Sequence, residues 1–396
     1  MTTPVFETRT AALHQARELA TQIRARAKQT ELDRCVPRAS IEELTASGLF
    51  NLITPRVFGG SELGFAALVE VTAELAAACG STGWVYGVLA GHSWLLNLFP
   101  VEAQREILTD PHSLTATVFR LEGKVTHVDG GYRLVGGEGR FCSGIDHARW
   151  VIVGNAVTQP DGTLEPRFFV VPRADVAIVD DWFTAGMRGT GSRSIRIADS
   201  LIPEHRSVKV QQMLTGVSPG ASFHTKPLYR MPFQDIAPFS LVGAPLGMAR
   251  AAIRAFADGL GASVSKLADE QVAAQSATFA RLAQAAADID AAFALVIEDA
   301  NRIDQAAGPE SLSAVDRARI ARDWAYAAQT SRYAVNRVFE ASGGSGIYDS
   351  SELQRIWRDV NSAAQHFAFT WDSAMTNFGR ILLGLKSMQL GPRSGR

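Results

Sequence analysis

The sequence is poor in cysteine and carries almost no net charge. Its three cysteines, Cys35, Cys79 and Cys142, are widely spaced in 396 residues and form no Cys-x-x-Cys pair. This number and spacing argue against a disulfide framework or a zinc site and favour a reducing compartment such as the cytoplasm. A formal net charge of −1 gives no electrostatic footprint for nucleic acid or an anionic membrane. We therefore expect small-molecule chemistry.

Other features of large functional classes are missing as well. No apolar run approaches the roughly 18 residues that a membrane-spanning helix needs. The first residues form a charged amphipathic pattern without the apolar centre of a signal peptide. No histidine, cysteine or glutamate cluster has metal-ligand spacing, and neither a Gly-x-Ser-x-Gly nor a His-Glu-x-x-His motif occurs. These absences predict a protein that spans no membrane and binds no metal.

The periodicity of apolar residues changes twice along the chain. It is helical to about residue 99, has a period of two between about 111 and 210, and is helical again from Met231. A chain of this length exceeds the usual limit for one core, so we expect domains at residues 1–110, 111–215 and 216–396. Six short runs are predicted strands: 115–119, 124–128, 132–135, 150–153, 167–171 and 194–197. Several short strands with hairpin turns indicate a small barrel or sandwich.

Local signals place several boundaries. Ser40 is the expected N-cap of a helix, and the glycines within 80–83 are expected to break the run before a helix over 84–98. Residues 211–230 are a linker or a mobile loop, and we favour a loop near the substrate entrance. Apolar seams over 272–303, 320–338 and 367–385, with a helix beginning near Ser240, predict four antiparallel bundle helices. The fold class is thus α+β and mostly α.

The stretch from Gly343 to Asp372 combines a glycine-rich break with a new helix. Read locally, it is a helix–turn–helix connection in which His366 is an ordinary residue. However, GGSGIYDSSELQRIWRDV resembles the glycine turn and Arg–Asp segment near the C-terminus of the acyl-CoA dehydrogenase superfamily. In the dehydrogenases of this superfamily, the segment that follows carries the catalytic carboxylate. This chain has Gln365-His366-Phe367 there, which resembles the flavin-dependent monooxygenase branch.

The resemblance covers nearly the whole chain and implies a fold and an activity. The fold would be an N-terminal helical domain, a central β-barrel and a C-terminal four-helix bundle. The activity would be that of the oxygenase component of a two-component monooxygenase, similar to hydroxylases of 4-hydroxyphenylacetate and steroid rings. Such enzymes take reduced FMN or FAD from a separate NAD(P)H-dependent reductase and use O₂ through a C4a-hydroperoxyflavin to hydroxylate an aromatic molecule. A homotetramer is also implied.

Two glycine-containing segments resemble flavin-contacting segments of this family. In the first, FCSGIDHARW, Ser143 would lie near the flavin N5 after Phe141 and Cys142. In the second, GMRGTGSR, the backbone at Gly189 and Thr190 would approach the flavin. Either Arg188 or Arg193 would pair with a phosphate or fix a neighbouring strand. Without the resemblance, both segments are simply turns.

The resemblance also implies two catalytic histidines beside Ser143. His92, on the helix after Gly80-Ser-Thr-Gly-Trp84, would accept a proton or hydrogen bond from the substrate, and His366 would act on the oxygen side as well as contact the flavin. A lone histidine on an apolar helix is otherwise a core residue.

Aromatic residues would line the substrate pocket, and one departure from the family affects it. The pocket residues we expect are Trp84, His92, Thr117, Phe119, Phe239 and Phe367. Phenol hydroxylases of this type add a polar contact from the first strand, where this chain has Ala116-Thr117-Val118. If Val118 points inward, the pocket is more apolar and a phenol is less certain.

Three alternatives remain open at this stage. A true acyl-CoA dehydrogenase needs a carboxylate base that the segment after Asp359 does not supply. An oxygenase acting on sulfur or nitrogen would use the same oxygen chemistry, so only the product distinguishes it. A helical scaffold with a vestigial flavin site is the non-enzymatic alternative.

Overall fold

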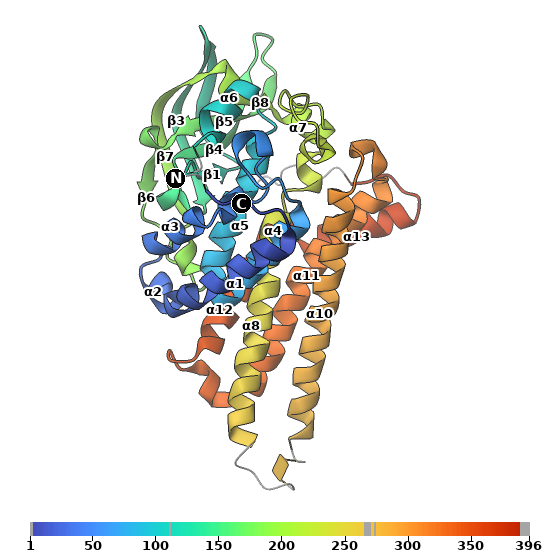
Figure 1. Ribbon diagram of the computed structural model, residues 1–396. Helices are drawn as coiled ribbons and strands as arrows, with labels where there is room; N and C mark the ends of the chain where they lie inside the picture. The colour runs from blue at the N-terminus through green and yellow to red at the C-terminus, as the bar shows by residue number, and fades with distance from the viewer. Residues whose placement is uncertain (1–2, 111, 265–270, 273–274, 389–396) are drawn as a thin grey trace.

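The structure is a computed structural model that describes residues 3–110, 112–264, 271–272 and 275–388. Helices, then strands, then helices follow one another along the chain (Figure 1). The predicted α+β, mostly helical class is therefore confirmed. The helices before the strands are α1 (Arg9–Ala25), α2 (Ala27–Leu32), α3 (Arg38–Ala46), α4 (Phe65–Ala78), α5 (Gly80–Leu96) and α6 (Val101–Leu108).

Helix α5 is buried along its whole length and packs against both α4 and α8. It begins at Gly80, so the expected break over 80–83 is wrong, and only the extended Cys79 separates it from α4. These glycines serve packing instead of termination. A Cβ atom on Gly83 would lie 2.4 Å from the Ala76 backbone, and one on Gly87 would lie 2.1 Å from the Ser240 carbonyl oxygen. Small residues thus let α5 approach its neighbours closely.

Ser40 is not an N-cap, because α3 already begins at Arg38 after the extended Pro37. Its hydroxyl is buried and accepts a hydrogen bond from Arg26 Nη1 at 3.1 Å. The serine is therefore a link between α3 and the end of α1.

The strands form one sheet in the order β6-β7-β3-β2-β4-β5-β8, and β1 pairs in parallel with β4. Five of the six predicted runs lie within strands, and the first, 115–119, extends one residue past the end of β1 at Val118. Strands β6 and β8 were not predicted, because three residues are too few to show a period. Because all eight strands belong to one sheet, the two separate sheets of a sandwich are not observed in the described part of the chain. The strands are β1 (Thr115–Val118), β2 (Lys124–Val128), β3 (Gly131–Cys142), β4 (Trp150–Thr158), β5 (Leu164–Pro172), β6 (Ala177–Val179), β7 (Arg193–Pro203) and β8 (Ser207–Lys209).

Long helices run side by side after the strands (Figure 1). These later helices are α7 (Val210–Thr215), α8 (Phe239–Val264), α10 (Ser276–Asp304), α11 (Ala314–Ala341), α12 (Glu352–Ala363) and α13 (Trp371–Leu382). The predicted seam of α10 began at Val272, which lies before that helix, and residues 273–274 are outside the described part. The segment Phe233–Val264 is apolar and long enough to cross a membrane, but 72% of its most apolar window is buried inside the protein. This burial is expected of a bundle's core helix.

Helix α13 departs from the prediction of a buried seam. It lies against α11, yet none of its residues is buried, and Leu382 is 63% and Leu383 78% exposed. Within the described chain the apolar face of α13 is therefore only partly covered.

The linker at 211–230 is held against the N-terminal helices. His224 Nε2 lies 2.8 Å from Gln104 Oε1, and the Tyr229 hydroxyl donates to the Ile53 carbonyl oxygen at 3.1 Å. These contacts fix the path of the chain toward Phe233, which begins the approach to α8.

Candidate functional site

Trp84 on α5 joins parts of the chain that are distant in sequence. Its indole N–H donates to Ser143 Oγ at 3.3 Å, and its ring meets the His366 ring edge-on with 5.4 Å between centroids. Ser143 follows the last strand residue of β3, and His366 lies between α12 and α13. The structure therefore brings three residues of the predicted site together from all three parts of the chain.

Ser143 is presented by a tight turn of left-handed backbone. Phe141 has φ +65° and Gly144 has φ +71°, and the ladder between β3 and β7 shifts register between Gly139 and Cys142. The Gly144 N–H donates to the Thr190 carbonyl oxygen at 3.1 Å, so the turn is bound to the second glycine segment. A non-glycine residue at positive φ costs free energy and is often found at functional sites.

His366 is neutral, and its hydrogen bond indicates where its proton lies. Nδ1 accepts the Ala368 backbone N–H at 3.2 Å, so this nitrogen carries no proton and Nε2 must carry one. The surrounding atoms desolvate the partly exposed ring and lower the pKa of His366 to about 4. At neutral pH this imidazole is therefore a hydrogen-bond donor through Nε2.

His92 has the opposite tautomer. Its Nδ1 lies 2.6 Å from the Thr115 carbonyl oxygen, which can only accept, so Nδ1 carries the proton and Nε2 has a free lone pair. Burial lowers the pKa of His92 to about 4, although the Thr115 carbonyl opposes this. Thr117 Oγ1 also lies 3.3 Å from Nδ1. Among the described residues Nε2 has no hydrogen-bond partner, so this imidazole is an available acceptor.

Thr117, and not Val118, shares the side of β1 that faces His92. Val118 points the other way, because its Cγ1 lies 2.5 Å from where a Cβ on Gly139 would be. A polar side chain of this strand therefore lies beside His92, whereas the apolar Val118 packs toward Gly139 of β3.

Aromatic rings extend from His366 toward the end of β1, beginning with Phe367, whose ring centroid lies 4.4 Å from that of His366. Phe119, two residues after Thr117, meets Phe367 at 6.0 Å, Phe233 at 5.7 Å and Phe168 at 6.0 Å between centroids. Phe239 does not join them, because it is fully buried and packs on Phe65 and Trp324 in the core. Phe168 and Phe233 were not predicted. Phe233 lies in the linker, where no periodicity reveals which residues meet the strands.

The remaining predicted flavin contacts differ in what their side chains can do. Arg193 is engaged by Asp146 and by Asp180 at 3.2 Å, so it fixes the strands. Arg188 is exposed and donates only to a backbone carbonyl, with no ion pair among the described residues. Cys142 is fully buried, and desolvation raises the pKa of its thiol, so only its backbone is available to a ligand.

These groups fit a flavin in their chemistry. A partly exposed Ser143 hydroxyl, the Phe141 ring with 69% of its surface exposed and the exposed Arg188 guanidinium suit a planar polar ring with a phosphate tail. The 188–191 turn contains Gly191 at φ +52°, a conformation that glycine adopts easily. Because glycine has no side chain, the backbone of this turn can lie close to a bound flavin.

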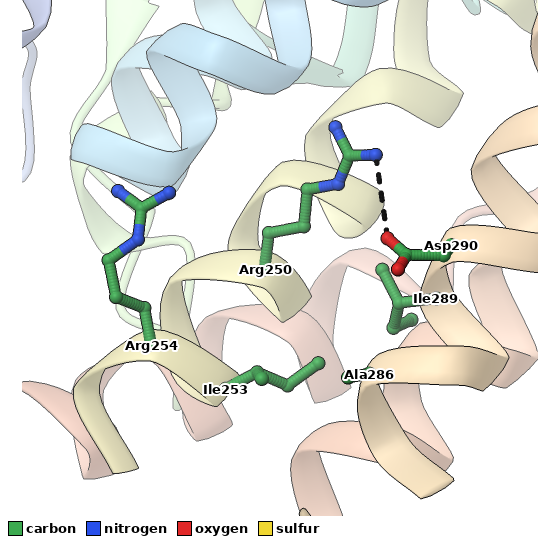
Figure 2. A pocket seen from close by; sticks show the side chains of 6 residues that line it. All are labelled: Arg250, Ile253, Arg254, Ala286, Ile289 and Asp290. Atoms are coloured by element: carbon green, nitrogen blue, oxygen red, sulfur yellow. Dashed lines mark ion pairs between the residues drawn. The ribbon is translucent and has the colours of Figure 1, made fainter. Parts of the chain in front are cut away.

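One surface hollow lies elsewhere. It opens between α8 and α10, and Figure 2 shows Arg250 of α8 directed toward Asp290 of α10 with an N···O distance of 3.9 Å. None of the predicted site residues lines this hollow. No group of three or more potential metal ligands occurs in the described part of the chain.

Comparisons with known proteins agree on family and fold. The N-terminal domain model of acyl-CoA dehydrogenases matches residues 7–111, and the C-terminal domain model matches residues 240–371. The chain is 35% identical over 380 residues to the oxygenase component of an FADH(2)-dependent resorcinol hydroxylase of Rhizobium sp. (strain MTP-10005), covering 93% of each chain. It is also 35% identical to the oxygenase subunit HsaA of a flavin-dependent monooxygenase of Mycobacterium tuberculosis, covering 93% of this chain and 94% of HsaA.

A solved structure supports the same conclusion. The 3-HSA hydroxylase from Rhodococcus sp. RHA1 superposes with a TM-score of 0.91 at 31% identity, covering 96% of this chain and 98% of that one. The expected fold, monooxygenase activity and use of reduced flavin with O₂ are confirmed, and the acyl-CoA dehydrogenase alternative is not supported. The chain belongs to the acyl-CoA dehydrogenase superfamily, in the branch formed by the oxygenase components of flavin-dependent monooxygenases.

Proposed function

We propose that this oxygenase component hydroxylates a small phenolic aromatic compound whose hydroxyl group binds at His92. The observation that carries the proposal is the pair of neutral imidazoles with opposite tautomers. His92 Nε2 can accept the phenol proton, whereas His366 Nε2–H can donate. An electron-rich ring reacts faster as its hydroxyl proton is withdrawn, so an acceptor at this point favours the reaction.

The protein's own residues bind and orient the substrate. Trp84 and His92 are eight residues apart on α5, so their backbones are separated by about 12 Å along the helix. Contacts run from Ser143 to Trp84, from Trp84 to His366, and through Phe367 to Phe119. We propose that the substrate lies between this row of side chains and His92. Aromatic side chains there exclude water from the reacting atoms.

Reduced FMN or FAD, when bound, supplies the reaction with O₂. We propose that Ser143 and the backbone at Gly189 and Thr190 hold its ring system and that Arg188 pairs with its phosphate. His366 would donate to the oxygen side. As an oxygenase component, the chain receives reduced flavin from a reductase, which we propose to be a separate NAD(P)H-dependent enzyme in the cytoplasm.

We also propose a homotetramer, in which a second copy covers the apolar face of α13. Exposed leucines on an amphipathic helix are typical of a surface that is buried on assembly. The exposure of Trp371 and Leu382, at the two ends of α13, in the single chain supports this interface.

Product analysis tests the function. Purified protein is mixed with O₂, chemically reduced FMN or FAD, and resorcinol or p-hydroxyphenylacetate, and the products are identified by mass spectrometry. In parallel reactions a sulfide or an amine replaces the phenol, and oxidised flavin is incubated with an acyl-CoA thioester. We expect a product with one added oxygen on the ring and no reduction of oxidised flavin by acyl-CoA thioesters. Oxygen added to sulfur or nitrogen substrates only, or flavin reduction by a thioester, would contradict the proposal.

A further inference from the structure

A row of three hydroxyl groups extends from Ser143 into the strand domain. Ser143 Oγ lies 2.7 Å from Ser192 Oγ, which lies 2.7 Å from Thr190 Oγ1, and Thr190 Oγ1 lies 2.9 Å from the Met187 carbonyl oxygen. Thr190 and Ser192 are 3% and 5% exposed, whereas Ser143 is partly exposed at the open end of the row. Water therefore has little access to the two inner hydroxyls.

The direction of each hydrogen bond in this row follows from its closed end. A carbonyl oxygen can only accept, so Thr190 must give its single hydroxyl proton to Met187. Thr190 then has only lone pairs for Ser192, so Ser192 donates to it. By the same step Ser143 donates to Ser192, and its proton is directed away from the site.

The open end of the row is consequently an acceptor. Ser143 Oγ receives the Trp84 indole N–H and has one lone pair left. We infer that Ser192 and Thr190 are positioning residues that keep Ser143 a hydrogen-bond acceptor toward the flavin. The inference rests on the proposed binding of flavin at Ser143.

The far end of the row is fixed by the bundle. Met187 has φ +54°, and its N–H donates to Asp359 Oδ1 of α12 at 2.5 Å. Its carbonyl oxygen also accepts the Trp182 indole N–H at 3.0 Å. The carbonyl that sets the direction of the row therefore cannot turn away without breaking contacts to two other elements.

An acceptor at this position distinguishes the two redox states of a flavin. N5 carries a proton in the reduced flavin and is a lone-pair acceptor in the oxidised flavin. Ser143 can bind the first and repels the second. With Ser192→Ala, the Ser143 proton is released and can be donated to oxidised N5, while acceptance from reduced N5–H remains possible.

Equilibrium binding of reduced and oxidised flavin, measured anaerobically and aerobically on the full chain, tests the inference. In wild type we expect tighter binding of the reduced form. In Ser192→Ala, the affinity for oxidised flavin should rise about three- to tenfold, the value of one neutral hydrogen bond. The affinity for reduced flavin should stay nearly unchanged. Thr190→Val should act in the same direction, whereas Thr190→Ser keeps the row and should resemble wild type.

Damage to the fold would weaken the binding of both oxidised and reduced flavin, so it cannot produce a higher affinity for the oxidised form alone. Ser331→Ala is the matched control, because it removes a buried hydroxyl of α11 that donates to the Ala327 carbonyl oxygen far from the site. An unchanged ratio of the two affinities in both Ser192→Ala and Thr190→Val would overturn the inference. Wild-type protein that binds neither form would instead refute the proposed function and the inference with it.

Discussion

Trp84 and Ser143 are joined by a hydrogen bond of 3.3 Å between α5 and the end of β3. The same indole ring packs edge-on against His366 from the α12–α13 connection. One side chain of the N-terminal helices thus sets the separation between the hydroxyl proposed to hold the flavin and the imidazole proposed to act on the oxygen. A shift of any of the three parts of the chain changes this geometry, so the site depends on the whole fold.

His366→Ala should uncouple flavin oxidation from hydroxylation. The variant lacks the Nε2–H donor, so we expect more hydrogen peroxide per flavin oxidised and product lower by about tenfold or more, the usual scale for losing a positioned proton donor. Peroxide and product are quantified in the same reaction. His14→Ala, an exposed histidine of α1, is the control. Unchanged coupling in His366→Ala would show that this imidazole has no such role.

Acid should destabilise the protein through its buried neutral histidines. The folded pKa of His92, about 4, is below its ordinary value of 6.5, so the unfolded chain binds more protons between these values. Its stabilising contribution is complete above pH 6.5 and is lost as pH falls toward 4, by about 1.4 kcal/mol per pH unit within this window. Urea unfolding at pH 7 and pH 4.5 measures the loss. His92→Gln cannot be protonated and should lose less stability on acidification than wild type, and an equal loss would contradict the assigned burial.

Asp359 should matter for its acceptor oxygen and not for its charge. Burial, helped by the nearby charge of Glu31, raises the pKa of this carboxyl group to about 6. Asp359→Ala leaves the buried Met187 N–H without a partner and should lower the free energy of unfolding by about 1–3 kcal/mol. Asp359→Asn retains an acceptor oxygen for this N–H, so its free energy of unfolding should fall by clearly less. Denaturant unfolding compares the two, and equal losses would show that the charge is what counts.

The apolar face of α13 should control assembly. Leu382→Glu places a charge on the proposed interface and forfeits roughly 1.5–3 kcal/mol of apolar burial per copy. We expect smaller species in sedimentation velocity at micromolar concentration. Leu32→Glu makes the same change at another leucine that is 65% exposed and should leave the size unchanged. A wild-type monomer, or a Leu382→Glu variant of wild-type size, would argue against this interface.

The sequence predicted those features that local pattern determines. Alternation identified the strands of β3 and β7 because their side chains face two different environments. The resemblance of the Gln365-His366-Phe367 segment indicated an oxygenase where a dehydrogenase has a carboxylate. Boundaries that depend on packing were missed. The glycines at 80–83 look like a break but allow α5 to touch α4. The seam of α13 looks like a core position, although the described residues cover it only in part.

Contacts between distant segments were beyond reach of the sequence. In the sequence, Ser192 is one residue of the glycine-rich segment GMRGTGSR, with nothing to mark it. Its proposed role follows only from its distances to Ser143 and Thr190. The tautomers of His92 and His366 likewise depend on two backbone groups, the Thr115 carbonyl and the Ala368 N–H, which no pattern of side chains reveals.

The source of the oxygen atom is the most direct test of the central claim. Reduced flavin, resorcinol and ¹⁸O₂ are mixed with the protein, and the ring product is analysed by mass spectrometry. The account predicts one labelled oxygen atom in the hydroxylated product and none from water. Unlabelled product, or peroxide alone under conditions in which reduced flavin binds and phenols are present in excess, would contradict it.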